Sequence, residues 1–254
     1  MRIGVIGAGN MAAALVRGWD EPVLVFDPRS EHARALAAEV GGDALASGAE
    51  VADQADLVVL CHKPAQLCEV AEELRQGARC VVSILGGTPV AEVEAAYPER
   101  PVYRFMPNVG AEVRRGVFCY APGTRAGEGP EDEVLELFGR LGRVIAVPES
   151  SLEAATALMG CGPAFFSLVA EGLVDAGVGH GLGPEEAALM VVETMAGTAA
   201  LLAEREAVHD TKALRARVTS PGGSTARGLA ALERGGVRAS LQDAVDAVVW
   251  GGPR

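Results

Sequence analysis

The residues best suited to bind a ligand form a glycine-rich turn, Ser220-Pro221-Gly222-Gly223-Ser224-Thr225, which runs directly into a helical pattern at residues 226–233. Two adjacent glycines let the backbone approach a ligand closely, and free N–H groups at the start of a helix attract an anion. The turn is therefore typical of a pocket for a carboxylate or a phosphate. An equally economical interpretation is a plain turn in which Ser224 or Thr225 caps the helix.

A second chemical motif, Gly7-Ala8-Gly9-Asn10-Met11-Ala12, lies near the start of the chain. It follows a strand pattern and opens a helical pattern, which is the context of a dinucleotide-binding Gly-x-Gly-x-x-Gly/Ala turn. The first glycine permits the tight turn, the second lets the backbone meet a pyrophosphate, and Ala12 lets the helix pack on the strand. The residues expected to contact a dinucleotide are Gly7, Ala8, Gly9, Asn10 and Met11.

Asp27 ends the second strand pattern, near the spacing at which an acid accepts hydrogen bonds from the ribose of NAD. Arg29 and Ser30 follow almost at once, and an arginine beside a hydroxyl can hold the 2′-phosphate of NADP. The expected cofactor is therefore NADPH or NADH, and these residues do not distinguish between the two.

Two further loops follow buried strand patterns, where open α/β sheets bind their ligands. In Cys61-His62-Lys63-Pro64, His62 suggests proton transfer and Lys63 a Schiff base, but a loop that contacts the nucleotide is the simpler interpretation. Met106-Pro107-Asn108 is expected to line the nicotinamide pocket, although a turn capped by Asn108 is equally economical. We therefore assign both loops to cofactor binding.

The elements that must position these loops are strands alternating with helices. Strand patterns cover residues 3–6, 23–26, 57–61, 80–85, 102–105, 117–120 and 144–147. This alternation predicts an α/β fold in which helices cover both faces of a mostly parallel, doubly wound sheet of the Rossmann type. We place this dinucleotide-binding domain at residues 1–150.

Residues 151–254 show helical patterns only. One helix is expected from Pro163 to about Ala176 and another from Pro184 to about Leu202, and both are apolar nearly all the way round. A unit of about a hundred residues cannot bury two such helices by itself. We therefore predict an all-α dimerisation and substrate-binding domain, and a homo-oligomer built from dimers through the C-terminal helices.

Composition excludes several classes of function. A net charge of −12 opposes binding to nucleic acid. The five cysteines form no Cys-x-x-Cys pair and the four histidines lack metal-ligand spacing, so we expect reduced thiols and no metal. Uninterrupted apolar runs fall short of a membrane span and no signal peptide is evident, so a cytoplasmic protein without a membrane partner is expected.

Taken in order, these segments resemble the pyrroline-5-carboxylate reductase family over nearly the whole chain. The segments that carry the resemblance are the N-terminal Gly-x-Gly-Asn-Met, Lys63-Pro64, Ser83-Ile84, and residues 104–108, 160–165, 175–178 and 218–233. The last is the most specific, because the wider dehydrogenase superfamily shares only the nucleotide motif. Among the departures, Ser224 replaces the usual Thr and keeps the hydroxyl, Cys161 replaces a common Ser, and Arg114 replaces a Gly.

The resemblance implies reduction of the cyclic imine 1-pyrroline-5-carboxylate to L-proline by hydride transfer from NAD(P)H. It implies that backbone N–H groups of Gly223, Ser224 and Thr225 hold the substrate carboxylate, while the Thr225 hydroxyl reaches the ring nitrogen and is the catalytic group. The implied substrate-binding residues are Ser220, Gly222, Gly223, Ser224 and Thr225. Two alternatives remain open: a reductase of a six-membered cyclic imino acid, and a non-catalytic nucleotide-binding redox sensor.

Overall fold

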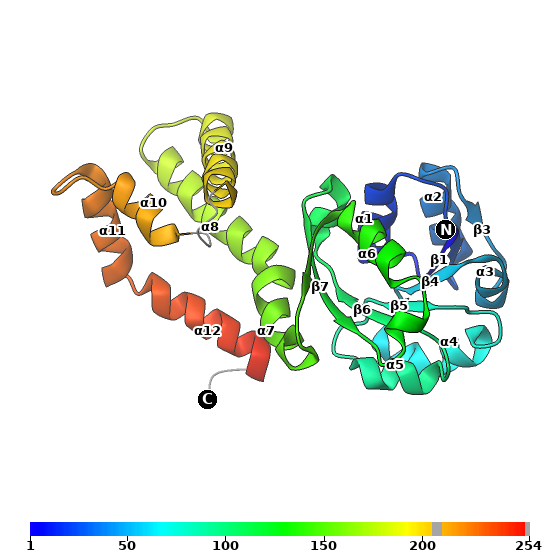
Figure 1. The fold of residues 1–254 in the computed structure, drawn as a ribbon. Coiled ribbons are helices and arrows are strands. Elements are labelled where there is room, and N and C mark those ends of the chain that lie inside the picture. Colours follow the sequence, from blue (N-terminus) through cyan, green and yellow to red (C-terminus); the bar gives the residue numbers. More distant parts are fainter. Residues whose placement is uncertain (205–209, 252–254) are drawn as a thin grey trace. The chain divides into compact units, whose positions relative to one another are not determined.

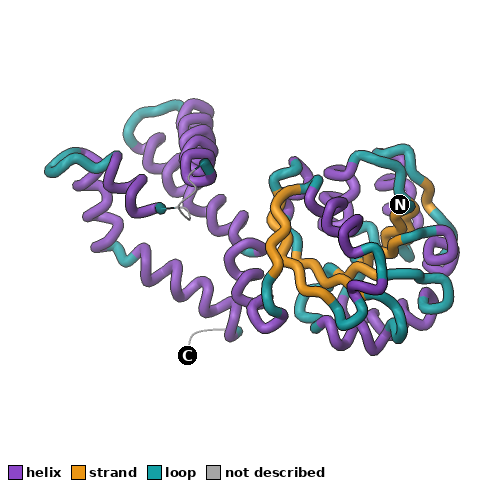
Figure 2. Tube along the Cα trace, in the orientation of Figure 1, coloured by secondary structure: helices purple, strands orange, loops and turns teal. Residues whose placement is uncertain are grey.

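The computed structural model describes residues 1–204 and 210–251 of the chain. It consists of two compact units, Met1–Gly160 and Cys161–Arg254. The described strands all belong to the first unit, and the second unit is helical wherever it has regular structure (Figure 2).

The strands of the first unit form one sheet in the order β3-β2-β1-β4-β5-β6-β7-β8. Neighbouring strands are parallel from β3 to β6, β7 is antiparallel to β6, and β8 is parallel to β7. The strands are β1 (Ile3–Ile6), β2 (Leu24–Phe26), β3 (Asp43–Ala44), β4 (Leu57–Leu60), β5 (Val81–Ser83), β6 (Val102–Met106), β7 (Gly116–Pro122) and β8 (Gly142–Ala146). The expected mostly parallel, doubly wound sheet is confirmed.

Helices cover both faces of this sheet (Figure 1). One face packs against α1 (Asn10–Trp19), α2 (Ser30–Glu39) and α6 (Glu131–Gly139), and the other against α3 (Gly48–Gln54), α4 (Leu67–Leu74) and α5 (Val90–Ala96). Successive strand residues alternate between the two cores, as Val5 and Ile6 do, because side chains of a strand point to opposite faces in turn. Short 3₁₀ helices, η1 (Pro64–Gln66), η2 (Val109–Val113) and η3 (Ala126–Glu128), lie in the loops.

Residues 149–160, here called the connecting segment, end the first unit. They form η4 (Glu149–Ser151), α7 (Leu152–Ala155) and a π-helical turn, η5 (Thr156–Gly160). Leu152 and Met159 are buried in a small core with Met106 of β6 and Cys119 of β7. The connecting segment is therefore packed against the sheet although its own sequence is helical.

The second unit contains α8 (Gly162–Gly179), α9 (Pro184–Ala203), α10 (Thr211–Arg217), α11 (Ser224–Arg234) and α12 (Val237–Trp250). The two long helices expected from the sequence are present, each with a proline in its first turn. A Cβ atom on Gly177 of α8 would lie 3.4 Å from the Ala187 Cβ of α9. The absent side chain at Gly177 thus lets α8 and α9 pack closely.

The apolar side chains of α8 and α9 are largely exposed. Phe166, Leu168 and Leu189 expose 63%, 68% and 64% of their surfaces. Two helical stretches, Glu149–Gly179 and Pro184–Ala203, are long and apolar enough to cross a membrane by length and composition alone. The uninterrupted apolar runs within these helices are shorter than a membrane span, because acidic residues such as Glu171 and Glu193 interrupt them without ending the helices.

Candidate functional site

The glycine-rich turn after β1 is built for close approach of a ligand. Gly7 has a φ of 101°, and a Cβ atom there would lie 2.8 Å from the Cys61 carbonyl oxygen, so only glycine fits. Gly9 is the N-cap of α1 and makes no side-chain cap, and a Cβ atom on it would meet no atom within 4 Å. Asn10 and Met11 form the first turn of α1, whose backbone N–H groups have no partner within the helix and no side-chain cap. This cradle fits the pyrophosphate of a dinucleotide.

The strand order places this turn at the topological switch point of the sheet, because β2 lies on one side of β1 and β4 on the other. Open α/β sheets bind ligands in the crevice at that point. The turn after β1 and the loop after β4 are brought together here, since the Cys61 N–H donates to the Ile6 carbonyl at 2.8 Å.

Asp27, at the end of β2, is buried and turned toward the protein. Its Oδ2 accepts from the Ala8 N–H at 2.9 Å, and its Oδ1 accepts from the Arg29 N–H at 2.9 Å. Burial acts to raise the pKa of Asp27, but these backbone hydrogen bonds and the Arg29 side chain outweigh it, so the pKa is lowered. Asp27 thus fixes the glycine-rich turn to β2, while the Arg29 side chain and Ser30, the first residue of α2, remain exposed.

The loop after β4 presents Lys63 and Pro64 to solvent and turns the other two side chains inward. Burial raises the pKa of the Cys61 thiol, which opposes a nucleophilic role. His62 Nδ1 donates to the Lys63 carbonyl at 2.9 Å, and its Nε2 is buried with no partner among the described residues. Burial lowers the pKa of His62 despite that hydrogen bond. A neutral imidazole with a covered Nε2 is poorly placed to transfer a proton.

The loop after β6 is held mainly by protein contacts. Met106 belongs to the core beneath the connecting segment, and Pro107 is buried. Asn108 Nδ2 donates to the Met159 carbonyl at 3.0 Å, and its Oδ1 accepts from the Val117 N–H at 3.1 Å. Asn108 occupies the N-cap position of η2, but its side chain makes no capping hydrogen bond there.

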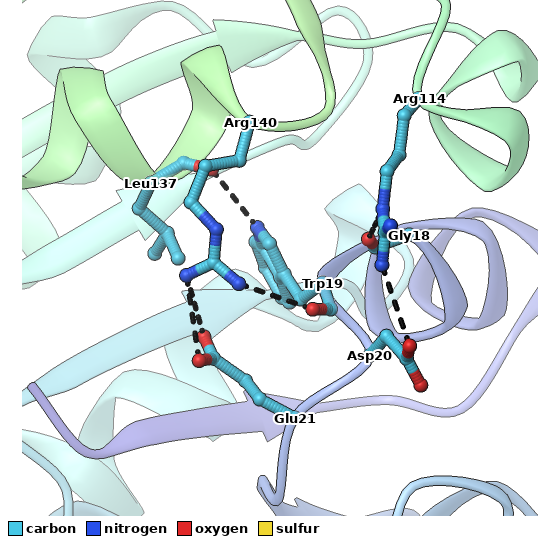
Figure 3. A network of polar contacts seen from close by, with 7 residues as sticks. All are labelled: Gly18, Trp19, Asp20, Glu21, Arg114, Leu137 and Arg140. Atoms are coloured by element: carbon cyan, nitrogen blue, oxygen red, sulfur yellow. Dashed lines mark hydrogen bonds and ion pairs between the residues drawn. The ribbon is translucent and has the colours of Figure 1, made fainter.

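The far end of α1 is held by Arg114, which the sequence analysis noted only as a replacement for a Gly, and by Arg140, which it did not mention. Arg114 Nε donates to the Gly18 carbonyl at 2.7 Å, and Arg140 Nη2 donates to the Trp19 carbonyl at 3.1 Å (Figure 3). These are carbonyls of the last turn of α1, which have no partner within the helix, and a positive charge there is favoured by the helix dipole. The two arginines thus fix the helix whose other end forms the dinucleotide turn.

In the second unit, the turn before α11 also begins a helix at a glycine. Gly223 is the N-cap without a side-chain hydrogen bond, so the alternative in which Ser224 or Thr225 caps the helix is wrong. The Gly223 N–H donates to the Ser220 carbonyl at 3.1 Å, and Arg227 Nη1 donates to the Gly222 carbonyl at 2.9 Å. Gly222 has a φ of 72°, which only glycine adopts readily.

The backbone N–H groups that are free at this turn differ from the expected set, because Ala226 takes the place of Gly223. Because the Gly223 N–H is engaged within the turn, the open N–H groups in the described structure are those of Ser224, Thr225 and Ala226. The Thr225 side chain is exposed and makes no hydrogen bond with any described residue. The turn can therefore bind a carboxylate through three N–H groups and present a hydroxyl beside it.

Among the described residues, no group of three His, Cys, Asp or Glu side chains gathers where it can hold a metal ion. Sequence reasoning also missed a buried ion pair between Arg104 of β6 and Glu149 of the connecting segment. A signal for it exists, because Arg104 is a charged residue in the middle of a buried strand pattern and must have a partner.

Comparison with known proteins gives matches to both parts of the chain. The family described as pyrroline-5-carboxylate reductase dimerisation matches residues 149–250, and the family described as NADP oxidoreductase, coenzyme F420-dependent, matches residues 2–87. Pyrroline-5-carboxylate reductase of Mycobacterium tuberculosis is 36% identical, over 97% of this chain and 94% of its own length. That of Methanosarcina acetivorans is 34% identical, over 96% and 94%.

Among solved structures, Plasmodium falciparum pyrroline carboxylate reductase with NADP bound superimposes with a TM-score of 0.87. It is 27% identical, and the match covers 98% of this chain and 95% of that one. The similarity thus extends over the dinucleotide turn and the glycine-rich turn alike.

The geometry of Asp27 predicts how stability depends on pH. Since its pKa is lowered in the folded protein, the stabilisation is present above the ordinary carboxyl pKa of about 4 and is lost as the pH falls through the folded value. Asp27→Asn is expected to lower the melting temperature by about 3–8 °C at neutral pH, and this difference should shrink toward about pH 3.

Thermal unfolding followed by circular dichroism across this pH range measures both effects. Asp43→Asn, at an exposed carboxylate of β3, is the control. A difference between wild type and Asp27→Asn that stays constant with pH contradicts the assigned hydrogen bonds.

Proposed function

Because the chain belongs to the pyrroline-5-carboxylate reductase family, we propose that it reduces 1-pyrroline-5-carboxylate to L-proline with NADPH or NADH, the last step of proline biosynthesis. The observation that carries this function is that the similarity spans nearly the whole length of the chain and of its relatives. The chain is an oxidoreductase whose residues 149–250 match the dimerisation family of these reductases and whose residues 2–87 match the NADP oxidoreductase family.

Within this reaction, the first unit binds the coenzyme. The open N–H groups at the start of α1 fit a pyrophosphate, with Gly7 and Gly9 allowing its approach and Asp27 holding the turn in place. We assign Lys63 and Pro64, exposed after β4, and Asn108 after β6 to the surroundings of the ribose and nicotinamide. When bound, the reduced nicotinamide supplies the hydride.

The second unit binds the substrate. The N–H groups of Ser224, Thr225 and Ala226 donate hydrogen bonds to the substrate carboxylate, and Arg227 holds their turn by donating to the Gly222 carbonyl. The Thr225 hydroxyl donates a hydrogen bond to the ring nitrogen or relays a proton from water, because its own pKa makes it a poor general acid. A protonated imine is already a strong electrophile, so orientation and hydrogen bonding suffice.

Direct assay tests this function. Initial rates with pyrroline-5-carboxylate are expected to exceed those with a six-membered cyclic imino acid. The reverse preference points to the alternative reductase. A folded protein that binds NADPH but reduces neither compound refutes the enzymatic proposal and supports the redox sensor.

Removing the Thr225 hydroxyl is expected to impair catalysis without unfolding the protein. Thr225→Ala should lower kcat/KM by about a hundredfold or more, comparable with the loss of a preorganised hydrogen-bond donor. Steady-state kinetics with purified protein measures the effect.

Thr219→Ala is the matched control, because the Thr219 hydroxyl already donates to the Arg215 carbonyl at 2.6 Å. It should change kcat/KM by no more than about twofold. Near-normal turnover by a folded Thr225→Ala variant contradicts the role assigned to Thr225.

For coenzyme choice, the orientation of Asp27 supports NADPH. Both carboxylate oxygens hold backbone N–H groups, whereas the Arg29 guanidinium is exposed at the start of α2 beside Ser30. We propose that Arg29 and Ser30 bind the 2′-phosphate, through charge-assisted hydrogen bonds and the helix N-terminus.

Arg29→Ala is therefore expected to raise the KM for NADPH at least about tenfold and to leave the KM for NADH nearly unchanged. Arg34→Ala, at another exposed arginine of α2, is the control. An equal loss with both coenzymes contradicts a 2′-phosphate contact.

The exposed apolar faces of α8 and α9 support a cytoplasmic homo-oligomer built from dimers through the C-terminal helices. The dimerisation family matches the same residues, which favours a second copy of the chain over a lipid bilayer as the cover for these helices. If the helical units are exchanged between subunits, each active site draws on two chains.

Placing a charge on this surface is expected to break the dimer. Leu189→Glu buries an unpaired carboxylate in the interface and should weaken dimerisation at least about a hundredfold. Sedimentation velocity measures the effect, and Arg34→Glu on the first unit is the control. Recovery of wild type from the membrane fraction, or an unchanged dimer in Leu189→Glu, contradicts this assembly.

A further inference from the structure

The ion pair between Arg104 and Glu149 is the most deeply buried charged contact in the first unit that coenzyme binding does not explain. The Arg104 side chain is only 7% exposed and that of Glu149 34%. Arg104 pairs in register with Ser83 of β5, in the middle of the sheet. A charge at such a place is tolerated only when it is paired.

One oxygen of Glu149 joins three parts of the unit. Glu149 Oε1 accepts from Arg104 Nη1 of β6, and also from the Val90 N–H at 2.9 Å. Val90 is the first residue of α5 and ends the loop that follows β5. The carboxylate therefore ties β6, the loop after β5 and the first residue of the connecting segment together.

The other end of the connecting segment is held by a second polar contact. Asn108, in the loop after β6, donates to the Met159 carbonyl at 3.0 Å. Between the two contacts, Leu152 and Met159 pack on Met106. The segment is thus held to the first unit at Glu149 and at Met159, and the residues beyond the second contact are Gly160-Cys161-Gly162, which lead into α8.

We propose that Arg104 and Glu149 are positioning residues for imine reduction: their ion pair fixes the connecting segment to β6 and the loop after β5. This rests on the proposed function, since hydride transfer needs the substrate turn of a helical unit to meet a coenzyme held at the carboxyl ends of the strands. When the connecting segment is docked, the backbone between it and α8 can bend only at Gly160-Cys161-Gly162. In the described structure the Arg104 and Glu149 side chains both contact protein groups of the first unit.

The charges must be removed together to separate this role from folding. A single substitution leaves an uncompensated buried charge, whereas apolar residues of similar volume at both positions usually preserve stability. The test variant is therefore the double substitution Arg104→Met/Glu149→Met. Arg125→Met/Glu128→Met, at an exposed ion pair of η3, is the matched control.

The double variant is expected to keep a melting temperature and an NADPH Kd close to those of wild type, because the dinucleotide turn is untouched. Its kcat for pyrroline-5-carboxylate should fall at least about tenfold, as expected for lost positioning of reacting groups. Hydrogen exchange of amides in residues 149–160 should become faster, while that of α1 stays unchanged. The control variant should match wild type in all four measurements.

A kcat within about twofold of wild type, or unchanged exchange in residues 149–160, overturns the proposal. Arg104→Lys is the second variant, because it keeps the charge but replaces the planar guanidinium by a point charge. It should give the same changes in smaller degree, and wild-type kcat and exchange in Arg104→Lys also overturn the proposal. If wild type itself does not reduce the imine, the proposed function fails, and the exchange measurement still reports whether the ion pair docks the segment.

Discussion

Both ligand-binding turns depend on a helix that begins at a glycine without a side-chain cap. Gly9 precedes α1 and Gly223 precedes α11, and neither helix has a side chain that satisfies its first N–H groups. A Ser or Asp cap typically stabilises a helix by about 1 kcal/mol, so these two helix ends give up that stability. In return their N–H groups stay free of side-chain caps, which suits the anions proposed for them, a pyrophosphate at α1 and a carboxylate at α11. Much of the surrounding structure compensates for these open ends: Asp27 holds the first turn, Arg227 the second, and Arg114 and Arg140 the far end of α1.

The parts of the fold that the sequence predicted are those with strong local patterns. The strand β4 is a continuous apolar run, and α8 and α9 each carry a proline in the first turn. The strand β3 escaped prediction because two residues, Asp43 and Ala44, carry no periodicity. The limits of α8 and α9 came within a few residues, since Pro163 and Pro184 mark their starts and Gly181 follows α8.

The candidate site was predictable in its motifs but not in its side-chain orientations. The glycine turns were identified because few residue types permit such backbone geometry. Nothing local shows that Asp27 faces the Ala8 N–H, that the Gly223 N–H is used inside its turn, or that Asn108 binds the Met159 carbonyl. These contacts join residues that the fold brings together, and Arg104 meets Glu149 across 45 positions of sequence. Of these residues, only Arg104 could have been recognised from the sequence as needing a partner, because it is a single charged residue among buried strand residues.

The connecting segment shows why the sequence boundary between the parts differs from the structural one. Strand patterns end at Val147, and the dimerisation family begins at Glu149, yet the compact first unit continues to Gly160. The reason is that helical residues 149–160 bury Leu152 and Met159 against the sheet and are fastened by polar contacts at both ends. A π-helical turn at Thr156–Gly160 ends the segment, and such turns are rare and frequently lie at functional sites. Residues 149–160 thus belong by sequence to the dimerisation family and by packing to the unit that contains the sheet, which is why neither criterion alone divides the chain.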